Sequence, residues 1–384
     1  MELKVPFSRP SLVGNEREYI LESLESMHVS GDGSFTKRCN RLLEELLDVP
    51  NCLLTTSCTH ALEMAAILLD IQPGDEIIVP SFTFVSTANA FVLRGATPVF
   101  VDIRQDTLNL DENLLANAIT SRTKAIVPVH YAGVACEMDR IQDLADQADV
   151  RIVEDNALGL FARYKGRNLG TFGCMATQSF HETKNIICGE GGALLVNNVE
   201  FMERAEILRE KGTNRSKFLR GEVDKYTWVD LGSSFLPSDL LAAFLLAQLE
   251  KREEIHSLRE RLWARYQTGL KDWAAANKIR QPVVPDYCDS VYPSYHIILP
   301  SEDQRNRLIA HLKSRGVHSV FHYLPLHISP MGQLFGGRAG DCPVTEEISA
   351  QLIRLPLYLE LTDEDQSIVI NALHEFSVGP ALIT

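Results

Sequence analysis

The sequence predicts an α/β protein with a mostly parallel central sheet and a smaller C-terminal α+β domain. Between residues 52 and 180, short apolar runs alternate regularly with segments of helical periodicity. This alternation is typical of a parallel sheet that is covered by helices on both faces. From residue 282 onward, proline-containing turns separate shorter elements. We therefore expect a large domain at residues 1–240 and a smaller one at residues 241–384.

Length and composition are those of a soluble globular protein. The 384 residues suffice for two domains, and 45% of them are hydrophobic and 23% charged. The net charge of −14 argues against a nucleic-acid-binding surface. No apolar run approaches the roughly 20 residues that span a bilayer, so we expect no membrane association. The 8 cysteines form no CxxC pair, and the start has no signal-peptide pattern. A reduced, cytoplasmic setting is the simplest inference.

The expected elements follow from the hydrophobic periodicity. Helices are expected near residues 19–27, 35–47, 61–69, 83–93, 110–119 and 138–147, and strands at 52–56, 76–80, 97–102, 125–129, 151–154 and 175–180. After residue 200 the sequence predicts helices at 200–211, 238–273 (interrupted at most briefly), 302–314 and 363–376, and short elements at 295–299 and 317–322, the second alternating like a strand.

Chemically distinctive residues follow four of these strands. The strand at 52–56 leads into the turn Ser57–Thr59, and the strand at 76–80 precedes Phe84. Asp155 ends the strand that begins at Arg151, and Lys184 follows the strand that ends near Ser179. Ligands of α/β proteins bind beyond the carboxyl ends of the strands. We therefore expect these residues to meet at one edge of the sheet.

Together these residues are the parts required to bind pyridoxal phosphate (PLP). A lysine forms a Schiff base with the aldehyde, and an aspartate keeps the ring nitrogen protonated. An aromatic side chain covers the ring, and free amides at a helix start hold the phosphate. Each part has an ordinary alternative: Lys184 as a surface charge, Asp155 as a turn residue, Phe84 as a core residue, and Ser57 or Thr59 as an N-cap. The conjunction predicts that PLP is the cofactor and Lys184 the catalytic residue.

Longer strings resemble the DegT/DnrJ/EryC1/StrS family of sugar aminotransferases over essentially the whole chain. They stand at residues 31–33, 57–62, 73–76, 80–84, 128–133, 154–155 and 179–185. The resemblance implies the type I PLP-dependent, aspartate aminotransferase-like fold and a homodimer with its site at the subunit interface.

One branch of the family is most similar. It aminates dTDP-4-keto-6-deoxy-D-glucose at C4 with L-glutamate, giving dTDP-4-amino-4,6-dideoxy-D-galactose for cell-surface polysaccharides such as lipopolysaccharide or enterobacterial common antigen. The strings that resemble this branch are residues 84–96, 132–139, 180–185 and 211–216. An aminotransferase that acts on another nucleotide ketosugar or position is the alternative.

The resemblance also implies roles for single residues. It makes Lys184 the covalent attachment point and proton carrier, Asp155 the partner of the ring nitrogen, and Phe84 the stacking group. It assigns the phosphate to Ser179, Cys58 and Thr59, and to Ser234 of a neighbouring subunit. It places Tyr323 and His327 beside the sugar. Lys211 and Arg215 lie in a polar stretch of the sequence. This stretch has two interpretations: it reaches a nucleotide diphosphate, or it is a solvated loop.

One departure from the family pattern affects the cofactor site. Relatives commonly have Gln or His where this chain has Leu158, and that side chain contacts the phenolic oxygen of the cofactor. Leucine cannot make a hydrogen bond, so we expect an altered Schiff-base pKa or cofactor affinity, with Asn156 as an open substitute. A cofactor-binding relative without enzyme activity is an alternative that only Leu158 supports. The family's sugar dehydratases are disfavoured because they carry histidine where this chain has Lys184.

Three histidines, His318, His322 and His327, have a spacing that resembles a metal site. Pro325 excludes a continuous helix there, and the strand-like alternation over 317–322 explains the pattern without a metal. We expect no metal site.

Overall fold

A seven-stranded sheet forms the centre of the computed structural model, which describes residues 3–377. The spatial order of its strands is β1-β9-β8-β5-β4-β2-β3. Their bounds are β1 (Cys52–Thr55), β2 (Glu76–Pro80), β3 (Thr97–Val101), β4 (Thr123–Ile126), β5 (Arg151–Asp155), β8 (Met175–Ser179) and β9 (Gly192–Val196). Strand β9 runs antiparallel to β1 and β8, and the other strand pairs of this sheet are parallel. The expected mostly parallel sheet is confirmed.

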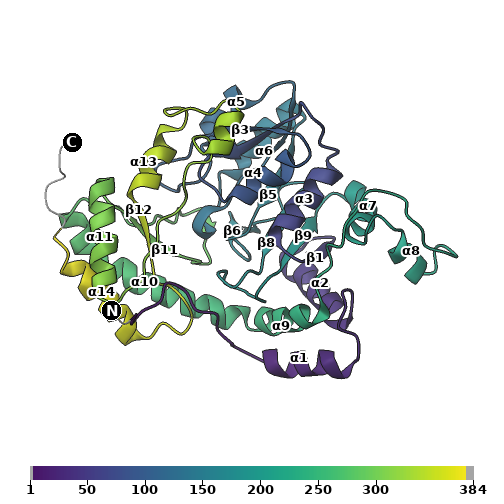
Figure 1. The fold of residues 1–384 in the computed structure, drawn as a ribbon, viewed down its shortest axis with the longest axis horizontal. Helices are drawn as coiled ribbons and strands as arrows, with labels where there is room; N and C mark the ends of the chain where they lie inside the picture. The colour runs from purple at the N-terminus through teal and green to yellow at the C-terminus, as the bar shows by residue number, and fades with distance from the viewer. Residues whose placement is uncertain (1–2, 378–384) are drawn as a thin grey trace.

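Helices cover both faces of this sheet (Figure 1). Alternate residues of a strand point to opposite faces, so β2 contributes Ile77 to one core and Ile78 to another. The helices on the Ile77 face are α3 (Cys58–Leu68), α4 (Val85–Val92) and α7 (Val199–Arg209). The helices on the other face are α2 (Ser34–Leu47), α5 (Leu115–Ala118), α6 (Met138–Ala148) and α9 (Asp239–Glu250).

A second body surrounds the two-stranded antiparallel sheet of β11 (Tyr295–Ile298) and β12 (Leu352–Leu355). Its core contains α10 (Arg252–Ala276), α11 (Glu302–Ser314) and α14 (Asp363–His374), together with Val5 from the N-terminal segment. The remaining elements are α1 (Glu16–Glu25), α8 (Arg215–Leu219), α12 (Pro330–Leu334), α13 (Pro343–Gln351) and the small sheet of β6 (Arg163–Tyr164), β7 (Arg167–Asn168) and β10 (Cys288–Asp289).

The expected division at residues 240 and 241 stays a proposal, and packing favours a later boundary. Helix α9 packs against α1 and α2 in the core of the large sheet, so we propose that the smaller domain begins near Lys251. Residues 1–2 and 378–384 of the two expected domains lie outside the described residues.

The structure corrects three expectations about elements. Residues 317–322 form no strand, because only isolated bridges, at Val317 and Val320, connect them to neighbouring segments. The helix expected at 110–119 is a 3-10 turn (Glu112–Leu114) followed by the short α5. Strand β9 was not expected, because its opening glycine reads as part of a turn. Within residues 3–377, no helix is long and apolar enough to cross a membrane, and no cluster of His, Cys, Asp and Glu could hold a metal ion.

One buried carboxylate joins α2 to α9. Asp239 accepts hydrogen bonds from the backbone amides of Phe35 (3.2 Å) and Thr36 (2.8 Å) and from the Thr36 hydroxyl (2.7 Å). A side chain on Gly33 would collide with this carboxylate. The acidic group satisfies free amides at the start of α2, so it fixes where that helix begins against the sheet.

We expect Asp239→Ala to lower the free energy of unfolding by about 3 kcal/mol, because it leaves buried donors without an acceptor. Urea denaturation followed by circular dichroism measures the change. Asp143→Ala, on the exposed side of α6, is the control and should stay within about 0.5 kcal/mol of the unmodified protein. Equal effects of the two substitutions would contradict the anchoring role of Asp239.

Candidate active site

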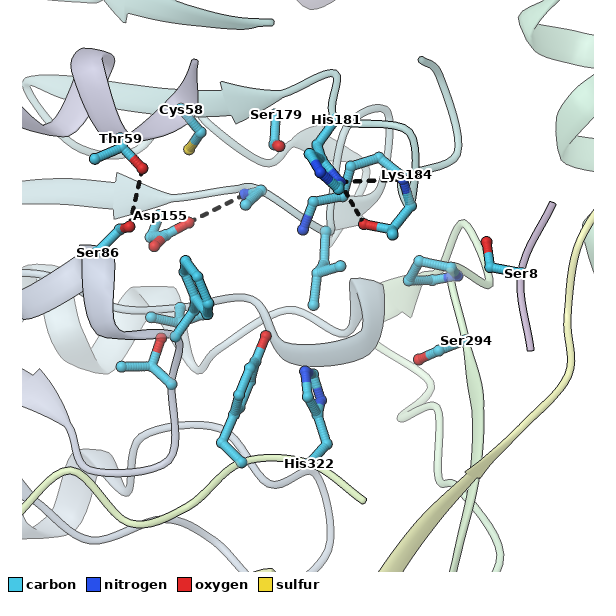
Figure 2. Close-up of a pocket in the computed structure, with 18 of the residues that line it drawn as sticks. Ser8, Cys58, Thr59, Ser86, Asp155, Ser179, His181, Lys184, Ser294 and His322 are labelled. Carbon is cyan, nitrogen blue, oxygen red and sulfur yellow. Dashed lines mark hydrogen bonds between the residues drawn. The ribbon is translucent and has the colours of Figure 1, made fainter. Parts of the chain in front are cut away.

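A cavity of about 630 Å³ lies at the carboxyl edge of the large sheet. Seven of the predicted site residues line it: Cys58, Thr59, Phe84, Asp155, Ser179, Lys184 and Tyr323. Figure 2 shows Cys58, Thr59 and Ser179 on one side and His322 on the opposite side, with Asp155 and Lys184 between them. The second body therefore forms the wall of the cavity that faces the large sheet.

Lys184 lies in the loop after β8, half-buried in the cavity. Its backbone amide donates to the His181 carbonyl (2.9 Å), and its carbonyl accepts from the Arg259 guanidinium (3.3 Å). Burial lowers the pKa of the Lys184 amine, and the negative charge of Asp155 offsets part of that shift. A lowered pKa increases the neutral, nucleophilic fraction of the amine at neutral pH.

The Asp155 carboxylate ends β5 and is held by two donors. The Thr87 hydroxyl donates to one oxygen (2.7 Å), and the Ala157 amide donates to the other (3.2 Å). The Thr83 hydroxyl in turn contacts that of Thr87 (2.8 Å). The side chain is thereby oriented and buried beside the cavity, as a carboxylate that binds a cationic ring nitrogen must be.

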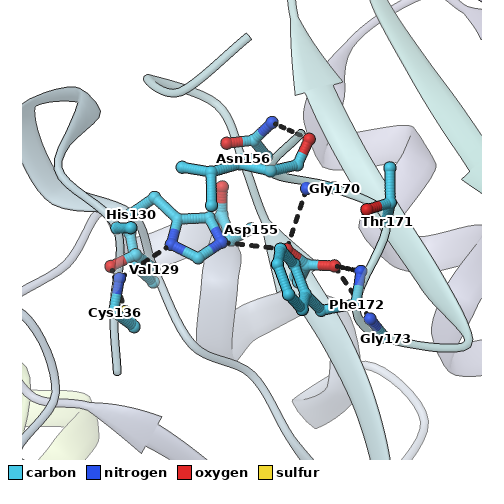
Figure 3. Close-up of polar contacts among 12 residues, drawn as sticks. Val129, His130, Cys136, Asp155, Asn156, Gly170, Thr171, Phe172 and Gly173 are labelled. Carbon is cyan, nitrogen blue, oxygen red and sulfur yellow. Dashed lines mark hydrogen bonds and ion pairs between the residues drawn. The ribbon is translucent and has the colours of Figure 1, made fainter. Parts of the chain in front are cut away.

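The neighbouring carboxylate, Glu154, fixes the end of β5 (Figure 3). It accepts from the backbone amides of Gly170 (2.8 Å), Phe172 (2.7 Å) and Gly173 (2.8 Å). His130 Nε2 lies 3.0 Å from the same group, while His130 Nδ1 accepts from the Cys136 amide (3.2 Å). This pairing assigns the ring proton to Nε2, which donates to Glu154. The network leaves the adjoining Asp155 little freedom to move.

Free backbone amides lie at the start of α3. Ser57 caps this helix, its hydroxyl accepting from the His60 amide (3.1 Å). The hydrogen bonds of the described chain leave the amides of Cys58 and Thr59 without acceptors, and Ser179 adds a hydroxyl nearby. A side chain on Gly192 would collide with the backbone of Ser57 and Cys58. Free amides at a helix start suit a phosphate.

Phe84 and Leu158 line the cavity, whereas Asn156 does not. The Asn156 side chain is buried and donates to the Leu169 carbonyl (3.2 Å). Asn156 is therefore not placed to substitute for the polar group that Leu158 lacks. Phe84 is 57% exposed, and the centre of its ring lies 6.4 Å from that of Tyr323.

The prediction that His327 contacts the substrate is wrong in this chain. Its ring is buried, with Nδ1 2.6 Å from the Ser81 hydroxyl and Nε2 3.0 Å from Glu346. Both nitrogens are therefore occupied, and His327 does not line the cavity.

Three further predicted residues also lie outside the cavity. Lys211 (2.8 Å) and Arg215 (3.1 Å) both pair with Glu210, and Ser234 bridges to Glu210 through its backbone. Their assigned roles remain proposals.

Two residues of the second body, Arg354 and His322, line the cavity but were not predicted from the sequence to do so. Arg259, which holds the Lys184 carbonyl from α10, was also not predicted. The available signal was an arginine inside the apolar run Leu352–Leu355, because an arginine in a buried strand is rare without a partner.

Comparison with known proteins agrees with this geometry. A family model described as the DegT/DnrJ/EryC1/StrS aminotransferase family matches residues 10–374. GDP-perosamine synthase of Caulobacter vibrioides is 33% identical over 98% of this chain and 99% of its own. DesV of S. venezuelae has 31% identity and a TM-score of 0.88, with 98% of each chain covered. Spr1654 of Streptococcus pneumoniae, solved in a PLP form, has 28% identity and a TM-score of 0.88 over 96% of this chain and 97% of its own. The predicted PLP-dependent aminotransferase fold is confirmed.

The residues present fit PLP. The cavity offers a half-buried lysine for the aldehyde, an oriented carboxylate for the ring nitrogen, and free amides with a hydroxyl for the phosphate. The exception is Leu158, whose apolar side chain in the cavity lining offers no hydrogen-bond donor.

We expect the Lys184 amine of the cofactor-free protein to react with acetic anhydride at a lower pH than an ordinary lysine, whose pKa is about 10.4. Because burial disfavours the charged form, the labelling midpoint should move to lower pH. Peptide mass spectrometry across a pH series measures it, with the same peptide from urea-unfolded protein as the control. A midpoint equal to or above the unfolded one would contradict the shift.

Proposed function

Because this chain belongs to the DegT/DnrJ/EryC1/StrS aminotransferase family, we propose that it transfers the amino group of L-glutamate to C4 of dTDP-4-keto-6-deoxy-D-glucose. The product is dTDP-4-amino-4,6-dideoxy-D-galactose, a precursor for cell-surface polysaccharide. The observation that carries the proposal is the meeting of Lys184 and the oriented Asp155 in one cavity.

The choice of sugar nucleotide is supported by the branch-like strings, which include residues 84–96 and 211–216. The GDP-perosamine synthases of Caulobacter vibrioides and Escherichia coli O157:H7, 33% and 30% identical, favour a GDP-linked ketosugar as the second candidate. Both candidates are ketosugars linked to a nucleotide diphosphate, so the same cavity serves either.

PLP, when bound, supplies the electron sink that makes the Cα proton of an amino acid removable. The Asp155 carboxylate would hold a proton on the ring nitrogen, and the Thr87 hydroxyl and the Ala157 amide keep that carboxylate in place. Lys184 Nζ would accept the Cα proton of the amino donor in the first half of the reaction, and in the second half it would donate a proton to the sugar carbon that receives the amino group. Burial lowers the pKa of this amine, which raises the fraction in the neutral form that can accept a proton.

Other cavity residues are assigned to the phosphate and to the ring face of PLP. The amides of Cys58 and Thr59 and the Ser179 hydroxyl would bind the phosphate, and Phe84, which lines the same cavity, would cover the ring. Leu158 gives the cavity an apolar stretch of wall.

We propose that the active form is a homodimer. The segment after α7 exposes apolar side chains that a second copy would cover: Phe218, Leu219, Tyr226, Trp228, Val229 and Leu231. Among these residues, Trp228 is 77% exposed. Figure 1 shows α8 projecting from the side of the large sheet that is far from the second body. Lys211, Arg215 and Ser234 belong to the same segment, from which they would reach the cavity of the other copy.

A panel of ketosugar nucleotides tests the function. Purified holoenzyme with L-glutamate should aminate dTDP-4-keto-6-deoxyglucose faster than its GDP-linked counterpart. The H3–H4 coupling in the NMR spectrum of the product should be small, as for an axial amino group. A preference for the GDP-linked sugar would overturn the proposed substrate. A large coupling would overturn the proposed configuration at C4. No amination of any ketosugar would overturn the function.

Lys184→Ala should lower turnover at least about 1,000-fold, because general acid–base catalysis at a positioned group contributes factors of this size. Lys313→Ala, exposed on α11, should leave turnover unchanged. Circular dichroism should show the same fold for both variants. Turnover by Lys184→Ala close to the unmodified rate would contradict the assigned role.

A further inference from the structure

Arg259 is a buried cation whose hydrogen bonds go only to backbone carbonyls. It stands on α10 and is 5% exposed, and burial lowers the pKa of its guanidinium to about 10. The group therefore still carries its charge at neutral pH. Within residues 3–377 it donates to the carbonyls of Lys184 (3.3 Å) and Pro293 (3.4 Å), and its Nε atom makes no hydrogen bond. Arg259 thus joins the loop of Lys184 to a segment that is distant in the sequence.

The chain crosses between the two bodies at that segment. Val291 packs in a core of the large sheet, and Tyr295 packs in the core of the second body. Between them, Pro293 and Ser294 line the cavity. The crossing at residues 291–295 is therefore part of the cavity wall as well as a connection between the bodies.

Tyr292 gives this crossing an unusual backbone. Its φ is 51°, which lies in the left-handed region that bulky side chains rarely adopt, and it precedes a proline, which favours an extended backbone instead. Such a conformation persists only where the surrounding structure holds it, and it is concentrated near functional sites. The Tyr292 ring packs on Trp263 of α10, with 5.1 Å between the ring centres. The shape of the crossing therefore depends on contacts made by other segments.

Two side chains hold the crossing, one on each side of its left-handed residue. Asn185 Nδ2 donates to the Val291 carbonyl (2.7 Å), and the Arg259 guanidinium donates to the Pro293 carbonyl. Asn185 directly follows Lys184, whose own carbonyl accepts from the same guanidinium. The loop of Lys184 and the crossing are therefore joined at two neighbouring points.

These contacts fix the main chain of Lys184 and leave its side chain free to react. Arg259 binds the Lys184 carbonyl oxygen, and Asn185 acts from the next position along the chain. A reacting amine must move while its main chain stays in place, and a misplacement of about 1 Å can cost about 100-fold in rate.

We propose that Arg259 and Asn185 are positioning residues, which couple the place of Lys184 to the place of the second body. The inference rests on the proposed role of Lys184 in the aminotransferase reaction. Loss of either side chain should slow the reactions of the Lys184 amine and leave the phosphate and ring contacts of the cofactor site intact.

Capture of PLP by the cofactor-free full chain measures how well Lys184 is placed. The amine condenses with the aldehyde of PLP, so that a C=N bond replaces the C=O bond and one water molecule leaves. The rise of the long-wavelength absorbance after mixing gives the rate. Arg259→Met should lower this rate about 10- to 100-fold. Arg259→Lys, which keeps a cationic donor, should recover part of the loss, and Arg261→Met, exposed on the same helix, should leave the rate unchanged.

Pyridoxine 5′-phosphate separates positioning of the lysine from general damage to the site. It carries an alcohol in place of the aldehyde and cannot condense with an amine. Its Kd should change by less than about threefold in Arg259→Met, whereas a disordered site would bind it as poorly as it captures PLP. Asn185→Ala should slow the capture of PLP in the same way, and it provides the test if Arg259→Met does not fold.

Two outcomes would overturn the inference. One is an unchanged rate of PLP capture in the folded variants, and the other is a loss of affinity for pyridoxine 5′-phosphate that matches the loss in rate. Failure of the proposed role of Lys184 looks different: the unmodified protein then captures no PLP, and the inference fails with that role.

Discussion

The buried carboxylate of Glu154 is the constraint on which the rest of the site depends. It accepts from three backbone amides of the turn at residues 170–173 and is paired with His130. That turn leads directly into β8, the strand that delivers the loop of Lys184. One acceptor therefore fixes the end of the strand that carries Asp155 and the beginning of β8, the strand that leads into the loop of Lys184. The spacing between the two reacting groups follows from this backbone network more than from any contact between them.

The second body is held against the sheet by contacts of the same kind. Asp102 accepts from the amides of Val344 and Thr345 at the start of α13. His327 joins the Ser81 hydroxyl, at the end of β2, to Glu346 on α13. The histidine that was expected to bind sugar thus ties the two bodies together. These anchors position the part of the second body that carries His322, Tyr323 and Arg354. The second wall of the cavity is therefore held in place by residues that do not line the cavity.

Much of the sheet could be predicted because its strands are buried on both faces and read as apolar runs between helices. The convergence of Asp155 and Lys184 followed from the rule that carboxyl ends of parallel strands meet. The antiparallel β9 could not be predicted, because its pairing depends on neighbours distant in sequence and its first residue, Gly192, is a turn former. Residues 317–322 alternate like a strand but find no continuous partner. Arg354 was missed because one charge inside an apolar run has no local signature of what it faces. Lys211 and Arg215 pair with Glu210 in the single chain, and the sequence pattern carried no signal of that pairing.

The central claim is that Lys184 is the lysine that bonds the cofactor. Reduction of the holoenzyme with borohydride, followed by proteolysis and mass mapping, locates the phosphopyridoxyl group on the chain. We predict that it is found on Lys184 alone. A label on another lysine, or none after reduction of protein shown to contain PLP, would contradict the assignment of this cavity as the active site.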